Sequence, residues 1–261
     1  MTRHFLILIA ALAVAFGQSP TVSKEFDVVS VKPSAPDEHN SFMSQRLPGG
    51  NLRLIGLPLR MMIMRAYDVK AFQVSGGPDW VRTDRWDVLA KAEGVEDRLT
   101  PAQERPMLQA LLRNRFQLKV HIETKEMPVY ALAVDRSESK LTPNTGAVHQ
   151  FRSGNGSLTV NRGAITELVS WLSQELGRVV IDKTELNGEY DYALTWTPEP
   201  GQGGPESIGQ PPGTLGGVTP TFADGPSIFT ALQQQLGLHL VSQKGPVEIV
   251  VLDSAEKPSA N

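Results

Sequence analysis

One short stretch of the chain, HIETKE at residues 121–126, carries side chains that could do chemistry. His121 and Glu123 are two positions apart, so on a β-strand they share one face, where they could ligate a metal ion or act as a base and its partner. A metal site or a catalytic base needs a third group, and the adjacent sequence offers none. The charged surroundings favour a second interpretation, a solvated strand end beside a charged turn.

The motifs of common catalytic and cofactor sites are missing from the rest of the chain. There is no G-x-S-x-G, H-E-x-x-H, G-x-x-x-x-G-K-[ST] or G-x-G-x-x-G motif. His39, His149 and His239 are isolated in the sequence. The sequence therefore predicts no catalytic residue, no cofactor-binding residue and no metal-binding residue, and it favours a protein that is not an enzyme.

A methionine-rich helix is the second candidate for a binding surface, because such surfaces adapt to varied partners. Residues 58–68 follow a helical period whose apolar stripe is formed by Leu59, Met62, Ile63 and Ala66. Met62 lies in this stripe, whereas Met61 and Met64 fall outside it. We therefore expect Met62 to fill the core and the other two to be partly exposed.

The elements that would position these residues begin after an N-terminal secretory signal. Arg3 is followed by the apolar run FLILIAALAVAF, and Ala15 and Gly17 occupy the −3 and −1 positions of a cleavage site. The apolar run is shorter than the roughly 20 residues that span a bilayer. We expect cleavage near Gln18, no transmembrane segment in the mature chain, and a periplasmic or extracellular location; an uncleaved N-terminal anchor is the alternative.

Composition excludes several classes of protein. The formal net charge is −3, and it becomes −4 when Arg3 leaves with the signal, so nothing favours binding to nucleic acid or to an anionic membrane. The absence of cysteine excludes a lipid anchor, a disulfide scaffold, thiol catalysis and a cysteine-based metal site. A hydrophobic content of 40% is ordinary for a globular protein.

Hydrophobic periodicity predicts short strands interspersed with helices. In the first half we expect strands at 25–33, 72–76, 85–92, 116–123 and 128–135, a loop at 34–50, and helices at 58–68 and from Thr100, the latter interrupted at Pro106. In the second half we expect strands at 156–160, 178–182, 189–196, 238–243 and 247–253, and helices at 164–176 and 226–237. Residues 198–226 hold eight glycines and seven prolines, which predicts a flexible insertion.

The two halves follow one plan. Leu52 matches Leu158, and the segment MLQALLRNRFQLKV matches IFTALQQQLGLHLV in the same order of elements. We therefore predict an α+β fold of two similar mixed helix/sheet modules, each β-α-β-β-α-β-β. The predicted domains are a signal peptide at 1–17, modules at 24–140 and 148–253 with the insertion at 198–226, and a disordered tail at 254–261.

Each predicted module contains a strand in which an aromatic residue precedes aspartate, Trp86-Asp87 in the first and Tyr190-Asp191 in the second. Alternation along a strand puts the aromatics on one face with apolar residues and the aspartates on the other. We expect the aromatics to pack under the helices and the aspartates to cap or pair near turns.

Several segments closely resemble an uncharacterised family, the domain of unknown function 3738, which is abundant in soil acidobacteria. They include FDVVSVKPS, GGPDWVRTDRWDVLAKA and LGRVVIDKTELNGEYDYALTWTP, and the resemblance runs from about Phe26 to Pro258. It implies an exported protein with no established activity. In some relatives the domain is fused to membrane metallopeptidase sensors of the antibiotic-receptor type, a region that this chain lacks.

A second resemblance is to the short N-terminal module of secretins and TonB-dependent receptors. It is carried by ITELVSWLSQELGRVVIDKTELNGEYDYALTW and SIFTALQQQLGLHLVS. The resemblance implies a small α+β unit that contacts other periplasmic proteins and catalyses nothing. The Gly/Pro-rich insertion departs from the compact pattern of that module.

These observations favour a non-catalytic extracytoplasmic interaction or sensing module whose partner is an unknown protein or peptide in the cell envelope. Free sheet edges in small modules of this kind can accept a partner strand. One alternative is a protein that binds a small molecule or glycan in a cleft between the modules, with Trp80 and Trp171 exposed there. The other is a hydrolase that uses His121 and Glu123, which requires a third polar group within reach.

Overall fold

The computed structural model describes residues 25–35, 42–135, 139–198 and 225–258 of the chain. These residues divide into two compact units, each made of several chain segments. Unit 1 takes its described residues from 1–58, 84–116 and 257–261, and unit 2 takes them from 59–83 and 117–256. The module boundaries expected from the sequence stay a prediction.

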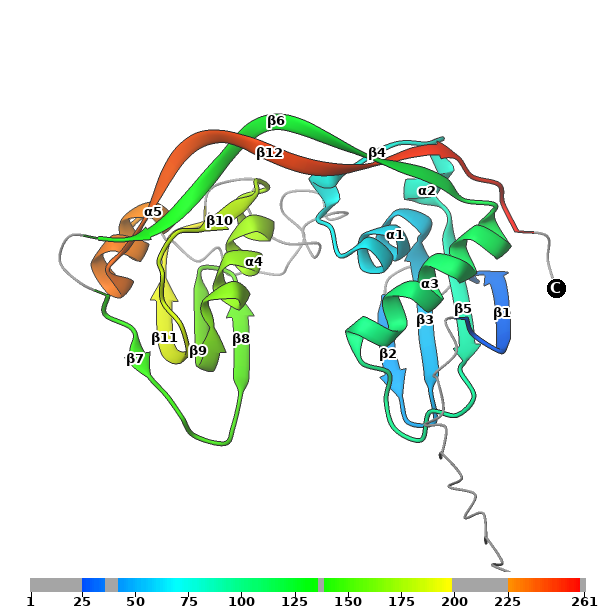
Figure 1. The fold of residues 1–261 in the computed structure, drawn as a ribbon, viewed down its shortest axis with the longest axis horizontal. Coiled ribbons are helices and arrows are strands. Elements are labelled where there is room, and N and C mark those ends of the chain that lie inside the picture. The colour runs from blue at the N-terminus through cyan, green and yellow to red at the C-terminus, as the bar shows by residue number, and fades with distance from the viewer. Residues whose placement is uncertain (1–24, 36–41, 136–138, 199–224, 259–261) are drawn as a thin grey trace, which may run out of the picture. The chain divides into compact units, whose positions relative to one another are not determined.

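Unit 1 is built on a four-stranded antiparallel sheet in the order β1-β5-β3-β2. Its strands are β1 (Val28–Pro33), β2 (Met43–Leu47), β3 (Asn51–Pro58) and β5 (Arg85–Lys91). Helix α3 (Pro101–Phe116) lies across one face of the sheet (Figure 1). Trp86 is buried and meets the ring of Phe116 edge to face, with ring centroids 5.4 Å apart, so the expected burial of the first aromatic is confirmed.

Helix α3 begins with the expected capping box but is not interrupted. The Thr100 amide donates to Oε1 of Gln103 at 2.9 Å, and the Gln103 amide donates to Oγ1 of Thr100 at 3.3 Å. The predicted break at Pro106 is wrong, because the helix continues through this residue to Phe116. Proline removes one amide donor in the second turn, and the buried Met107 and Leu108 that follow hold the helix in place through packing.

Unit 2 contains a sheet in the order β10-β6-β12-β4 that is dominated by two long strands (Figure 1). β6 (Lys119–Val134) and β12 (Leu238–Ser254) pair antiparallel along nearly their whole length. The three-residue strands β4 (Val74–Gly76) and β10 (Val180–Asp182) pair parallel to β12 and β6, respectively. We call the β6 and β12 pair the ribbon.

The prediction of two separate strands in each of these regions is wrong. The charged residues 124–126 and the polar residues 242–244, which suggested turns, lie mostly exposed in the middle of the continuous ribbon. Pro128 lies opposite Lys244, and Pro246 lies opposite Glu126. Because proline has no amide donor, each must occupy a non-hydrogen-bonded pair with its nitrogen toward the outer edge of the ribbon.

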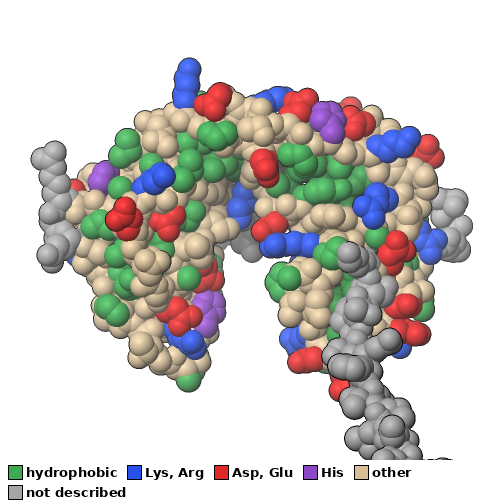
Figure 2. Space-filling view, viewed as in Figure 1, with side chains coloured by type: hydrophobic (Ala, Val, Ile, Leu, Met, Phe, Trp, Pro, Cys, Tyr) green, Lys and Arg blue, Asp and Glu red, His purple; other side chains and the backbone are tan. Residues whose placement is uncertain are grey.

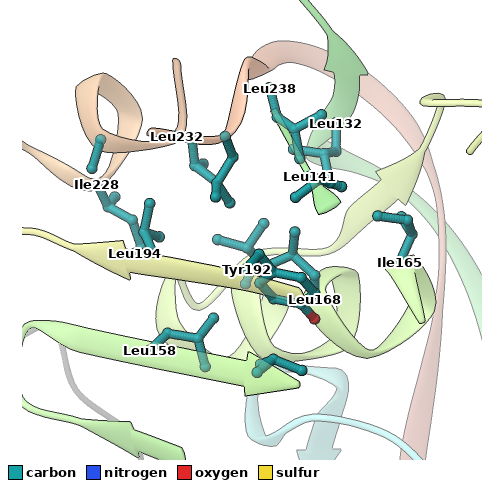
Figure 3. Packing of buried hydrophobic residues seen from close by; sticks show 14 of the residues in the cluster. Leu132, Leu141, Leu158, Ile165, Leu168, Tyr192, Leu194, Ile228, Leu232 and Leu238 are labelled. Atoms are coloured by element: carbon teal, nitrogen blue, oxygen red, sulfur yellow. The ribbon is translucent and has the colours of Figure 1, made fainter. Parts of the chain in front are cut away.

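The second sheet of unit 2 has the order β7-β11-β9-β8. Its strands are β7 (Thr142–Pro143), β8 (Gln150–Gly154), β9 (Ser157–Ala164) and β11 (Glu189–Thr195), and its helices are α4 (Ile165–Glu175), α5 (Ile228–Ala231) and the π-helical turn η4 (Leu232–Leu236). Figure 3 shows Leu158, Tyr192 and Leu194 of the sheet packed with Leu168 of α4 and Leu232 of η4. The predicted burial of this strand face is confirmed at Tyr192 and Leu194.

The remaining helices of unit 2 are α1 (Leu59–Tyr67), η2 (Ala71–Gln73) and α2 (Trp80–Thr83). The buried residues of α1 are those of the predicted stripe, Leu59, Met62, Ile63 and Ala66. Met61 and Met64 are half-buried, as predicted. Helix α4 also forms where its period predicts, and Gly177 after it has the expected left-handed conformation, with φ 59°.

The α+β class is confirmed, and the molecule is rich in strands. Strands β2 and β8, which the sequence pattern did not indicate, are short, polar and at sheet edges, so they lack the apolar alternation by which a strand is recognised. The expectation of a loop across 34–50 is therefore wrong at β2. The internal repeat stays a prediction.

Several expectations concern residues outside the described part of the chain. They are the signal peptide at 1–17, nearly all of the insertion at 198–226, His39, and residues 259–261 of the tail. Of the tail residues that the structure describes, Ser254 ends β12, and Lys257 Nζ lies 2.7 Å from an Asp84 carboxylate oxygen.

Candidate functional site

The structure gives His121 two carboxylate partners. Nε2 of His121 lies 3.0 Å from Oε1 of Glu123, the neighbour predicted to share its face, and Nδ1 lies 2.8 Å from Oδ1 of Asp253. Lys125 Nζ lies 2.6 Å from the other oxygen of Glu123. β6 supplies three of these residues and β12 supplies Asp253, so the cluster connects the two strands of the ribbon. Figure 2 shows a histidine beside acidic and basic side chains on the surface over the ribbon.

The geometry assigns His121 its charged form. Carboxylates only accept hydrogen bonds, so both ring nitrogens must carry protons to satisfy both contacts. The hydrogen bond to Glu123, and then that to Asp253, raise the pKa of His121 above its ordinary value of 6.5. Lys125 and then His121 lower the pKa of Glu123 below its ordinary value of 4.5.

Asp253 supplies the third polar group that the sequence did not offer, but the arrangement lacks the other parts of a catalytic site. In the part of the chain that the structure describes, His121 touches no hydroxyl group that it could activate, and both of its ring nitrogens already contact carboxylates. No group of three or more His, Cys, Asp or Glu side chains among the described residues is arranged to hold a metal ion. The cluster is exposed, with His121 48% accessible.

Two aspartates form polar sites inside the sheets. Asp87 is buried, and its Oδ1 accepts hydrogen bonds from Oγ of Ser34 at 2.6 Å and from the Gly56 amide at 3.0 Å. Gly56 has φ 70° and lies where the register of β3 against β5 shifts. The carboxylate therefore satisfies an amide that the bulge turns out of the ladder.

Asp191 has the same surroundings in unit 2. Its Oδ1 accepts from the Arg162 amide at 2.8 Å and from Nδ2 of Asn144 at 2.7 Å. Arg162 has φ 55°, and the register of β9 against β11 shifts beside it. The two aspartates, which were expected to cap or pair near turns, instead each accept hydrogen bonds at a bulge within a sheet.

The two other histidines that the structure describes, His149 and His239, do not combine into a site. His149 Nε2 lies 2.9 Å from Oε2 of Glu167 in the first turn of α4, and the pair is partly exposed. His239 is half-buried, and its Nδ1 makes no hydrogen bond with the described residues. The Tyr192 hydroxyl, also buried without a hydrogen bond there, has its pKa raised by burial and by the Glu167 charge.

The tryptophans named for the small-molecule alternative are half-buried. Trp171 meets Trp196 edge to face, with ring centroids 5.3 Å apart, and packs against the hydrophobic cluster of Figure 3. A pocket of about 320 Å³ lies in unit 1 between the start of β1 and the end of α3. Its lining includes Phe26, Asp27, Asn114 and Arg115. Its volume is at the low end of the range for ligand sites.

The family model described as "Protein of unknown function (DUF3738)" matches residues 60–255, so the chain belongs to this family. No curated protein and no solved structure matches the chain. No helix among the described residues has both the length and the apolar character required to cross a bilayer.

Proposed function

We propose that this protein is an exported, non-catalytic interaction module that binds a protein or peptide in the cell envelope. The observation that carries the proposal is that the polar groups around His121, Asp87 and Asp191 make their hydrogen bonds within the fold, while the outer edge of β8 has no partner strand among the described residues. The side chains of His121, Asp87 and Asp191 each make hydrogen bonds to other residues of the fold. An unpaired edge presents amide and carbonyl groups that another chain can bind.

We also propose that the two halves are copies of one module, in line with the resemblance to the periplasmic interaction module. The same contacts recur at matching positions. Ser34 donates its backbone amide to Arg85 at 3.0 Å, and Asn144 donates its amide to Glu189 at 2.9 Å. The corresponding pairs are Pro33 and Pro143, Ser34 and Asn144, Gly56 and Arg162, and Asp87 and Asp191.

The pairing within the ribbon supports this proposal in a second way. The short strand β4 of the first half pairs with the end of β12, and the short strand β10 of the second half pairs with the end of β6. Each half thus supplies the long strand on which the other half's short strand forms. The arrangement corresponds to a pair of modules that have exchanged their last strands.

The hydrolase alternative lacks a hydroxyl nucleophile in contact with His121 among the described residues. The small-molecule alternative retains one favourable observation, the pocket in unit 1. It is small, and Arg115 beside it donates to the Val29 carbonyl at 3.0 Å, so one of its polar groups already has a partner.

The test is affinity purification of the tagged full chain from the native envelope after mild chemical cross-linking. We expect a reproducible protein partner, which the His121→Ala, Glu123→Ala double variant retains. Recovery of a bound small molecule or glycan in place of a protein would favour the first alternative. Hydrolytic activity that the double variant loses would favour the second.

A further inference from the structure

Strand addition requires a sheet edge with several consecutive residues whose outward amides and carbonyls are free. Each of the three sheets has two outer strands, and the ribbon adds long outer edges of its own. Most of these edges carry features that prevent another strand from pairing. The exceptions identify where a partner can bind.

β1 is blocked on its outer side. It ends in Lys32 and Pro33, and Nη2 of Arg115 already donates to the Val29 carbonyl at 3.0 Å. A charged side chain, a proline and an occupied carbonyl are the usual protections of an edge strand.

The other edges of unit 2 are short or interrupted. β7 has two residues and includes Pro143, and β4 and β10 have three residues each. The uncovered length of β12 carries Pro246 with its nitrogen outward, and the uncovered length of β6 carries the exposed charges of Lys119, Lys125 and Glu126 before it reaches Pro128. In unit 1, β2 directly follows residues 36–41, which lie outside the described part of the chain, so its outer edge supports no inference.

β8 has neither a proline nor an outer backbone carbonyl occupied by a described side chain, and its one charged residue is Arg152. It has five residues, Gln150–Gly154, without proline, and among the described residues no strand pairs with its outer side. A two-residue turn joins Gly154 to Ser157, so these two residues exchange both ladder bonds. Alternation along the ladder then turns the amide and carbonyl groups of Phe151 and Ser153 outward.

The side chains near this edge indicate the chemistry of its partner. Arg152 is exposed and makes no ion pair or hydrogen bond with the described residues, so it favours an acidic side chain opposite. Val148, just before the strand, is 63% exposed and offers an apolar contact. The paired outer-face neighbours on β9, Thr159 and Asn161, are polar and uncharged.

A second copy of this chain fits the edge poorly. In the antiparallel, two-fold register that pairs both outward residues of each copy, Phe151 would join Ser153 of the other copy. Arg152 would then lie directly opposite Arg152 of that copy, and like charges in a cross-strand pair are destabilising.

We propose that β8 binds an extended segment of another envelope protein, which adds as a fifth strand and places an acidic side chain against Arg152. This proposal rests on the proposed function and names the surface and the chemistry of its partner. Recognition would come from backbone hydrogen bonds at Phe151 and Ser153 and from the charge of Arg152.

The experiment places a photo-cross-linking amino acid at Gln150 of the full chain in the native host, with the blocked edge residue Lys32 as the matched control position. Ser153→Pro removes the outward amide at an edge position that tolerates proline, and Ser153→Ala keeps the amide. Arg152→Glu reverses the charge without changing the backbone. Circular dichroism and thermal unfolding check that each variant folds.

We expect a protein cross-link from position 150 and none from position 32. The yield should fall at least tenfold in Ser153→Pro, stay unchanged in Ser153→Ala and fall severalfold in Arg152→Glu. If Ser153→Pro does not fold, the cross-linking yield of Arg152→Glu relative to the parent tests the proposal. A yield that is insensitive to these substitutions, or an adduct that is a second copy of the chain, would overturn the β8 proposal but not the proposed function. Absence of protein cross-links at positions across the whole surface would overturn both.

Discussion

At the scale of single residues, the cluster around His121 is a pH-dependent link between two strands. His121 contacts Glu123 and Lys125 pairs with Glu123 within β6, while Asp253 of β12 completes the contacts of the imidazolium ring. All four groups lie on an exposed surface, where ion pairs contribute little. The link therefore modulates the ribbon and does not hold it together.

Because the pKa of His121 is raised in the folded protein, its contribution to stability is fully present below the ordinary value of 6.5 and is lost as the pH rises through the folded value. Because the pKa of Glu123 is lowered, its contribution is present above 4.5 and is lost as the pH falls through the folded value. The link is therefore strongest between about pH 4.5 and 6.5.

We predict that His121→Ala with Glu123→Ala lowers the melting temperature slightly near pH 5.5, and that this loss shrinks as the pH rises through the raised pKa of His121. Thermal unfolding across this pH range, with and without added zinc, measures both effects. A zinc-dependent rise in the parent's melting temperature that the double variant lacks would contradict the assignment and indicate a metal site.

Replacing either bulge aspartate, Asp87 or Asp191, should lower the free energy of unfolding, but by different amounts. Asp87→Ala leaves the Gly56 amide and the Ser34 hydroxyl without an acceptor in a buried place, and we expect a loss of about 1–3 kcal/mol in the free energy of unfolding. Asp191→Ala should cost less, because Asp191 is only half-buried. Urea denaturation measures both values.

The control for this comparison is Asp79→Ala. Asp79 is exposed, and its carboxylate makes no hydrogen bond with the described residues, so we expect a change within about 0.5 kcal/mol. If Asp87→Ala were as mild as the control, the bulge amide would not depend on the carboxylate.

At the scale of elements, the helices could be predicted and the strand pairing could not. The stripe of α1 and the cap of α3 are local patterns that a helix imposes within a few residues. The ribbon joins residues more than a hundred positions apart. Its exposed middle carries charged residues of the kind that usually indicate a turn. For the same reason His121 and Glu123 could be found from their spacing, whereas Asp253, 132 positions from His121, could not.

The ribbon gives a direct prediction, because the chain has no cysteine of its own. Thr124 and Glu248 lie opposite each other. Non-hydrogen-bonded pairs alternate along the ribbon, and Pro246 and Pro128 occupy the second and fourth positions from this pair, so Thr124 and Glu248 also form a non-hydrogen-bonded pair. Such a pair has Cα atoms about 4.5 Å apart, within the range of a disulfide. We expect Thr124→Cys with Glu248→Cys to oxidise readily, as measured by gel mobility before and after reduction.

The matched control is Lys125→Cys with Glu248→Cys, whose side chains point to opposite faces of the ribbon and should not bond. Equal oxidation of the two pairs, or of neither, would mean that the long antiparallel pairing is not present in solution.

At the scale of the whole molecule, the proposed duplication explains why two sheets repeat one set of contacts while the ribbon is shared. A module of this type would lack a partner for its short strand unless another copy supplied one. In the proposed duplication, the second copy in the same chain always supplies the long strand with which that short strand pairs. The α+β class followed from the sequence, but the pairing of β4 with β12 and of β10 with β6 is a tertiary property that no local pattern encodes.

The Gly/Pro-rich insertion should be dispensable for stability. Replacing residues 200–222 with a brief Gly/Ser link removes few core-forming side chains, and loop closure changes by only about 0.6 kcal/mol for each doubling of length. We expect the free energy of unfolding in urea to stay within about 1 kcal/mol of the parent. A loss of several kcal/mol would show that the insertion packs against the fold.

The most direct test of the central claim, an exported module that binds a protein, is native mass spectrometry of the tagged chain released from its own envelope. We predict the mass of a chain that begins near Gln18, alone and in complex with a second, different protein. The contradicting result is a chain that retains Met1, or a mature chain whose only bound species is a small molecule.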